Sequence, residues 1–360
     1  MKKVIFALAA VVALAACSKE QTVVMPEGNA IGFNTFVDKA TRSVNDPSYT
    51  NDNLFANFGV FGTVEGAELF DDVEVKKNGS AWEYEGTQYW ITGANYNFAA
   101  VAPQTLNDTA VYTNAAYAVT STGEGAEKTY SGTTTLSFVN NGTTDLLYAE
   151  AKAIGKVGES SGAKNDVVGF TFRHVLSKVK FSFQNDYNAT NSFIAVKNIQ
   201  IENAYASAKA TLNANTVWEE QTGVLVLSFG HATDNESTTA TKEDTVSKYA
   251  YPYVYESQKE LLLIPGAATP LQGDAEKAGY KVTFDVELYI GDALIKSYPH
   301  VAYADFTPVA GNCYDIKTAI TTSNIDPDHQ QEPIEFTVTK IGEWGTDDNG
   351  DANGDNNKVM

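Results

Sequence analysis

The segment 167–184 (VVGFTFRHVLSKVKFSFQ) alternates apolar and polar side chains more strongly than the rest of the chain, and this period of two is typical of β-strands. The alternation changes phase within the segment. Phe172 lies on the face of the even positions, whereas Val179 and Phe181 lie on the face of the odd positions. A shift of one residue between faces requires a bulge or a corner, which we expect at 173–176. We therefore predict a corner in this segment, with Phe172, Val179 and Phe181 buried.

Shorter segments with the same period occur along the chain, and the sequence has no sustained helical periodicity. In 280–290, apolar residues alternate with Lys, Thr, Asp and Glu, which predicts an antiparallel strand with one face in water. Further strands are expected at 31–37, 57–63, 96–103, 145–151, 194–202, 222–229, 249–255, 260–264, 312–320 and 333–341. Because Tyr, Phe, Thr and Val are also abundant, the sequence predicts an all-β fold.

The N-terminus has the pattern of a secretory signal. A positively charged start precedes an unbroken apolar run from Val4 to Ala16, which is shorter than the roughly 20 residues that span a bilayer. The run ends in the letters LAAC, which look like a bacterial lipobox with Cys17 as the lipidated residue. Two or more acyl chains make a stable membrane anchor. We predict a signal peptide at 1–16 and lipid on Cys17; the alternative is an ordinary signal peptide that contains this cysteine by chance.

The net charge limits the classes of partner, and the number of cysteines limits the disulfides. The chain has 25 Lys and Arg against 45 Asp and Glu, a net charge of −20. This acidic balance argues against nucleic acid and anionic lipid as partners. If lipid occupies Cys17, Cys313 stands alone and no internal disulfide can form. Stability must then come from an apolar core and from the hydrogen bonds of the sheets.

No catalytic site, metal site or cofactor site is predicted. Residues 158–162 match the G-x-S-x-G pattern of hydrolases, but no amphipathic helix follows them, so we expect a loop. The end of the chain, 346–360, resembles a calcium loop, but Met360 stands where a bidentate Glu is needed. We interpret it as a disordered acidic tail. The histidines are too scattered for zinc or a triad, and His174 at the corner is expected to be buried and bonded to backbone.

An aromatic cluster at Trp82, Tyr84, Tyr89 and Trp90 has two interpretations. Aromatic side chains supply much of the buried area in β-sandwiches, which favours a place in the core. The alternative is an exposed surface that stacks on sugars, as in a surface glycan-binding lipoprotein of the outer membrane. Such a lipoprotein is the main rival to the function that the following motifs suggest.

The chain has only two arginines, and they lie in different contexts. Arg173 is inside the strongest β segment, whereas Arg42 follows the expected strand 31–37 and precedes turn-forming residues such as Pro47. By itself Arg42 would be interpreted as a solvated loop charge.

Several motifs occur together in a characteristic order: the lipobox, IGFNTFVDKATR, QYWITGANYNFAAVAP, DLLYAEAK, FRHVLSKVKFSF, LLLIPGA, GNCYDIKTAI and PIEFTVTKIGEW. This succession, which covers residues 1 to about 345, resembles the fimbrillin-like (Mfa-type) lipoproteins of Bacteroidetes, the subunits of type V pili. The resemblance implies two transthyretin-like antiparallel β-sandwich domains. The loop 155–166, which is rich in Gly, Ser and Lys, is the expected boundary between them, so the domains would span 43–166 and 167–345. The resemblance also implies export to the outer membrane with a lipid anchor, trimming by an arginine-specific protease, and assembly with other subunits into a cell-surface fimbrium for adhesion to a host or bacterial ligand.

The resemblance gives Arg42 a role that its position alone does not. We expect 17–42 to be a lipidated propeptide, cut between Arg42 and Ser43, whose strand 31–37 covers a hydrophobic groove. Loss of this strand would leave an unpaired sheet edge, which is a template for another chain. The donor would be 333–341 of a neighbour, with its apolar side chains Ile334, Phe336 and Val338 facing the groove. The alternative is that 333–341 completes the C-terminal domain of its own subunit.

Overall fold

The computed structural model describes residues 30–37, 55–125, 128–155, 167–187, 192–233, 253–268, 279–291, 293–329 and 332–343. Every element in these ranges is a β-strand, which confirms the predicted fold class. Within the same ranges no helix is long and apolar enough to cross a bilayer.

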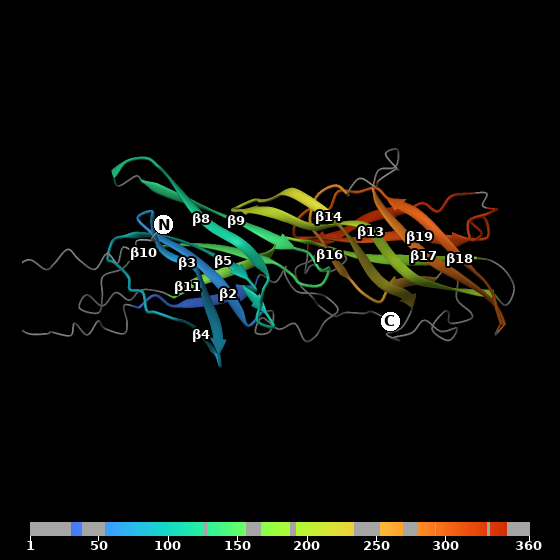
Figure 1. The fold of residues 1–360 in the computed structure, drawn as a ribbon, viewed down its shortest axis with the longest axis horizontal. Helices are drawn as coiled ribbons and strands as arrows, with labels where there is room; N and C mark the ends of the chain where they lie inside the picture. Colours follow the sequence, from blue (N-terminus) through green and yellow to red (C-terminus); the bar gives the residue numbers. More distant parts are fainter. Residues whose placement is uncertain are drawn as a thin grey trace, which may run out of the picture.

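A seven-stranded sheet occupies one end of the molecule (Figure 1). Its order is β1 (Phe33–Val37), β11 (Val168–His174), β10 (Leu147–Ile154), β5 (Asn95–Ala102), β2 (Asn57–Val64), β3 (Ala67–Asn78) and β4 (Ala81–Tyr84). Neighbouring strands run antiparallel, apart from the parallel pair of β1 and β11. The first and last strands of the chain segment that builds this sheet therefore lie side by side.

An eleven-stranded sheet forms most of the other end. Its main order is β18 (Ala293–Ala304), β17 (Tyr280–Ile290), β13 (Ser192–Leu212), β14 (Thr216–Thr233), β15 (Tyr253–Ser257), β12 (Ser177–Asp186), β19 (Asn312–Thr321) and β20 (Thr337–Glu343). In addition, β16 (Leu261–Leu263) pairs with β12, and the hairpin of β8 (Tyr112–Thr122) and β9 (Thr129–Val139) joins the edge of β13. The short strands β6 (Thr105–Leu106) and β7 (Thr109–Ala110) pair with each other. The pair of β12 and β19 is parallel, so both sheets are mixed rather than purely antiparallel.

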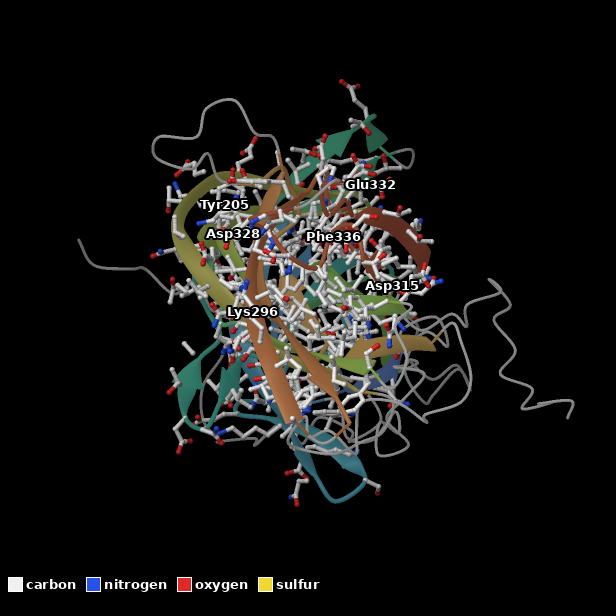
Figure 2. The ribbon with its side chains drawn as sticks, turned by 90° about the vertical axis from the view of Figure 1, so that its right-hand side faces the viewer. Tyr205, Lys296, Asp315, Asp328, Glu332 and Phe336 are labelled. Carbon is white, nitrogen blue, oxygen red and sulfur yellow. The ribbon has the colours of Figure 1, made fainter. Side chains whose placement is uncertain are left out.

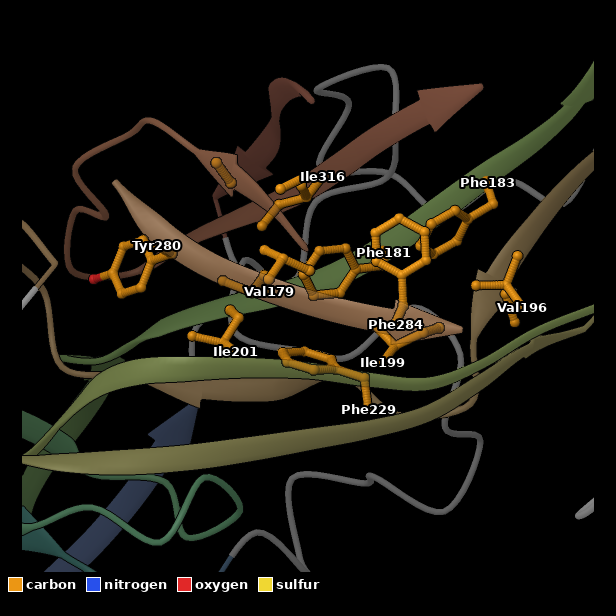
Figure 3. Close-up of a cluster of buried hydrophobic side chains, with 14 of the residues drawn as sticks. Val179, Phe181, Phe183, Val196, Ile199, Ile201, Phe229, Tyr280, Phe284 and Ile316 are labelled. Atoms are coloured by element: carbon orange, nitrogen blue, oxygen red, sulfur yellow. The ribbon is translucent and has the colours of Figure 1, made fainter. Parts of the chain in front are cut away.

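The large sheet folds over on itself, and its apolar faces meet in a core (Figure 3). Phe181 of β12 contacts Phe229 of β14 with 4.8 Å between ring centroids, and Phe183 contacts Phe284 of β17 at 5.2 Å. The predicted alternation in β17 is present from Tyr280 to Leu288, where the even-numbered residues are buried and the odd-numbered residues are half-buried, whereas Ile290, expected on the inner face, is exposed. This end of the molecule is therefore a β-sandwich made from one sheet.

The long strands β13 and β14 connect this core to a second one. Near one end β13 places Ile199 and Ile201 in the first core, and near the other it places Ala210 in a core beneath the seven-stranded sheet. Trp218 of β14 lies in that second core and donates a hydrogen bond from Nε1 to the carbonyl of Val175 at 2.8 Å. The two ends of the molecule thus share two continuous strands.

The predicted corner is confirmed. β11 ends at His174 and β12 begins at Ser177, and the two residues between them are fully buried. Phe172, before the corner, packs in the seven-stranded sheet, whereas Phe181, after it, packs in the large sheet. The expected boundary at 166 lies outside the described residues; β11, which follows it, still belongs to the seven-stranded sheet, and the chain passes to the large sheet after His174.

Replacing Phe181 with Ala should destabilise the fold strongly. The side chain is fully buried and contacts Phe183, Phe229 and Phe336, so the change leaves a large cavity. We expect the free energy of unfolding to fall by about 3–5 kcal/mol, measured by denaturant titration. The control is Val139→Ala, because Val139 is 70% exposed and should change stability by less than about 0.5 kcal/mol. An equal effect of both substitutions would show that Phe181 is not a core residue.

Candidate functional site

Strand β1 forms one edge of the seven-stranded sheet. It runs parallel to β11, with Phe33 opposite Val168 and Val37 opposite Phe172. The segment 31–37 was predicted to be a strand, and the structure confirms a strand at Phe33–Val37; its partner β11 belongs to the range that was assigned to the C-terminal domain.

The side chains of this segment enter the core rather than lie on it. Ile31 is 2% exposed and Phe33 is 5% exposed. The ring of Phe33 is surrounded by other aromatic rings, at centroid distances of 5.4 Å to Phe70, 6.0 Å to Phe98 and 5.8 Å to Phe170. At about 1.5–3 kcal/mol for each large apolar side chain buried, the two residues together contribute roughly 3–6 kcal/mol as an upper bound. The segment therefore contributes side chains to the core, and its removal would leave a groove lined by aromatic rings.

The opposite edge of the same sheet also holds this segment. The N–H of Ile31 donates to the carbonyl of Gln88 at 2.8 Å, and the hydroxyl of Tyr84, at the end of β4, donates to the carbonyl of Ile31 at 2.9 Å. The N–H of Gln88 in turn donates to the Tyr84 hydroxyl at 3.1 Å. Burial raises the pKa of Tyr84, so its hydroxyl keeps the proton that it donates. The chain segment before β1 thus bridges the two edges of a curled sheet.

Three of the four residues of the aromatic cluster lie in or against this core, which confirms the first interpretation for them, whereas Tyr89 is half-buried outside it and forms an isolated β-bridge with Ala30. Trp90 is buried and packs against Tyr96 at 4.7 Å, and Trp82 is half-buried against Phe58 at 4.9 Å. Tyr84 is half-buried and contacts Phe33.

Of the two arginines, the structure describes Arg173. This residue lies in β11 opposite Tyr148, and its guanidinium group lies over the ring of Tyr148 at 5.3 Å. The same group donates hydrogen bonds to Thr216 Oγ1, at 2.6 Å, and to the carbonyl of Asn213. A protease needs an extended, accessible arginine. Arg173 does not meet this need, because its main chain is paired in a sheet and its side chain is hydrogen-bonded. Arg42 and Ser43 lie outside the described residues, as does Cys17.

The C-terminal segment packs on its own chain. β20 pairs antiparallel with β19, with Val338 opposite Ile316, and begins later than the predicted strand 333–341. Phe336, which is labelled in Figure 2, contacts two core residues. Its ring centroid lies 5.9 Å from that of Phe181 and 6.1 Å from that of Phe284. Ile334, Phe336 and Val338 nevertheless remain half-exposed. In this chain, then, the segment covers the edge of the C-terminal core without being enclosed by it.

A groove runs beside this segment. It has a volume of about 490 Å³ and is lined on one side by residues 333–336 and Val338, and on the other by Val301–Tyr303 and Asp305 of β18 and the residues after it. β18 and β20 are the outer strands of the large sheet, and no hydrogen bonds join them as neighbours. The segment is therefore fixed along one side only.

The other candidate groups do not form a second site. His174 is buried, as expected, and its Nδ1 lies 2.5 Å from Oδ2 of Asp145. Burial raises the pKa of the Cys313 thiol to about 11, so it stays protonated and unreactive. Among the described residues no group of three or more His, Cys, Asp and Glu could hold a metal ion. The G-x-S-x-G residues 158–162 and the tail 346–360 lie outside the described ranges.

Comparison with known proteins identifies the family. A family model described as fimbrillin-like matches residues 41–344. Similar solved structures include a candidate cell adhesion protein from Bacteroides uniformis ATCC 8492, with 16% identity over 89% of this chain and 100% of that chain and a TM-score of 0.42. They also include the fimbrial anchor protein Mfa2 from Porphyromonas gingivalis, with 12% identity over 86% of this chain and 96% of that chain and a TM-score of 0.33. Comparison with the curated proteins gives no match. Because the family model spans most of its length, the chain belongs to the fimbrillin-like family.

Proposed function

We propose that the protein is a structural subunit of a cell-surface type V pilus that is exported as a lipoprotein precursor, cut after Arg42 and assembled by donor-strand exchange for adhesion. The family is fimbrial rather than enzymatic. One observation carries the finer proposal: the segment that supplies Ile31 and Phe33 to the core stands immediately before Arg42. A structural element that precedes a cleavage point can be withdrawn from the fold by a single cut.

The proposed precursor is tethered through Cys17 to the outer membrane. Residues 17–42 then form a propeptide that carries both the lipid and the strand β1. Cleavage between Arg42 and Ser43 by an arginine-specific protease separates the subunit from its anchor. The engagement of Arg173 with Tyr148, Thr216 and Asn213 supports a cut at the first arginine alone.

The cut changes the thermodynamics of β1 without changing its contacts. While the chain is intact, the strand is held at a high effective concentration by its own linker. After the cut it is a separate peptide, and its retention depends on concentration as for any ligand. Once it leaves, the edge of β11 is unpaired and the groove around Phe70, Phe98 and Phe170 is open.

The donor in this proposal is the C-terminal strand of a neighbouring subunit. Ile334, Phe336 and Val338 are apolar, alternate along one face and are only half-buried at home. Added to β11, such a strand supplies main-chain hydrogen bonds and fills the groove with its side chains. The contact joins two different surfaces head to tail and does not close, so it produces a fibre rather than a ring.

Replacing Cys17 with Ser should abolish lipidation. Labelled palmitate should enter the wild-type precursor, because the lipobox thiol is the proposed acceptor, and should be absent from the variant. The readout is autoradiography of the immunoprecipitated precursor. Equal labelling of the two proteins would refute Cys17 as the lipid acceptor.

Replacing Arg42 with Ala should leave the subunit long and monomeric. Without the cut, β1 stays in its groove and no acceptor edge is exposed. Electron microscopy and gel filtration after protease treatment would detect fibres, and the control is Lys39→Ala, which removes a nearby positive charge but not the arginine. Fibres formed by Arg42→Ala would contradict the proteolytic trigger, and fibres absent from both variants would show that the loop charge rather than the cut matters.

A further inference from the structure

We propose that the C-terminal segment of a second copy of this chain enters the β1 groove in one defined register, parallel to β11 and with Ile334 in the place of Ile31. This inference rests on the donor-strand exchange proposed above. It adds the orientation of the donor strand, its register and the residues that determine both. It is carried by four independent features of the two segments and of the groove.

The two segments have the same buried pattern. β1 and the residues before it present Ile31, Phe33 and Thr35 on their inner face, and the C-terminal segment presents Ile334, Phe336 and Val338 with the same spacing. Isoleucine matches isoleucine, phenylalanine matches phenylalanine, and threonine matches valine, which has the same branched shape. The pocket formed by Phe70, Phe98 and Phe170 around Phe33 therefore has one obvious occupant in the incoming segment, Phe336.

The outward positions tolerate the exchange. Glu335 would replace Gly32, and a Cβ atom at Gly32 meets only the side chain of Val167, at an ordinary contact distance of 3.8 Å. Thr337 would replace Asn34, which is exposed. Over positions 31–35 the two segments thus differ at Gly32 and Asn34, which the core does not enclose, and agree in shape at Ile31, Phe33 and Thr35.

The backbone contacts are compatible with the same alignment. The hydroxyl of Tyr84 and the carbonyl of Gln88 bind the carbonyl and the N–H of Ile31, and the N–H of Val168 donates to the carbonyl of Gly32 at 2.8 Å. Ile334 and Glu335 can supply all of these main-chain groups. Pro333 would replace Ala30, whose N–H takes part in none of the hydrogen bonds of the described residues, so the missing N–H of proline costs nothing there.

The exchange also improves the burial of the donor. At home Ile334 and Phe336 are half-exposed and lie beside the groove of about 490 Å³. In the acceptor they would take positions that are 2% and 5% exposed in the precursor. The donor side chains therefore move from a half-exposed position on their own subunit to an enclosed position on the acceptor. Tyr84 and Gln88 act as positioning residues that fix where the donor strand ends.

Disulfide trapping between subunits tests the register. In the precursor Asn34 lies opposite Gly169 of β11, and both are exposed, so Thr337 of a donor should come to lie opposite Gly169. Processed subunits with Gly169→Cys would be mixed with subunits that carry Glu335→Cys, Thr337→Cys or Thr339→Cys, all in a Cys313→Ala background. Paired strands bring Cα atoms within the range that a disulfide spans. Non-reducing gels of the fibres should show cross-linked subunits for Thr337→Cys and little cross-linking for the two neighbours that report registers shifted by two residues.

A single-chain control validates the geometry. The uncut precursor with Asn34→Cys and Gly169→Cys should form an intrachain disulfide, which shows that this pair of positions can be trapped. Fibres that cross-link through Glu335→Cys or Thr339→Cys, or through none of the three, would overturn the register while donor-strand exchange stands. Absence of fibres from the processed wild-type chain would instead overturn the proposed function and this inference with it.

Discussion

The packing of Phe33 into a ring of other phenylalanines is the contact on which the first end of the molecule depends. It fixes a short parallel strand against β11, and the neighbouring Ile31 is held by Tyr84 and Gln88 from the opposite edge. The curled seven-stranded sheet is closed by a segment that precedes its other strands in sequence. The core of this sheet is complete only while the segment that contains Ile31 and Phe33 is bound. When the segment leaves, the groove that it filled becomes an acceptor site.

Much of the fold could be predicted from side-chain alternation. The strand at 280–290 was predicted because apolar and polar residues alternate along it, and the corner after Phe172 was predicted because the alternation changes phase there. The strands β3, β4, β6, β7, β8, β9 and β18 were missed. β8 and β9 are rich in Ser, Thr and exposed positions, so their period carries little hydrophobic signal. β18 contains Pro299, which argues against a strand, yet it is tolerated because β18 is an outer strand.

The candidate site was predictable only in part. The sequence identified the apolar face of 31–37, because that face is local, and it identified the two arginines by their rarity. It could not identify Tyr84 and Gln88 as partners of Ile31, since those contacts join residues far apart in the chain and depend on how the sheet curls. For the same reason the sequence could not identify Asp145 as a partner of His174. Cys17, Arg42 and the cut remain proposals.

Amide hydrogen exchange on β11 tests the central claim most directly. In the precursor the N–H of Val168 donates to the carbonyl of Gly32, and because successive amides of a strand point to opposite sides, the amides of Phe170 and Phe172 also face β1. We expect these three amides to be protected in the precursor, to exchange rapidly in processed monomers from which the propeptide has been removed, and to be protected again in fibres. Unchanged protection of the three amides after removal of the propeptide would contradict the central claim, because the groove would then not depend on β1.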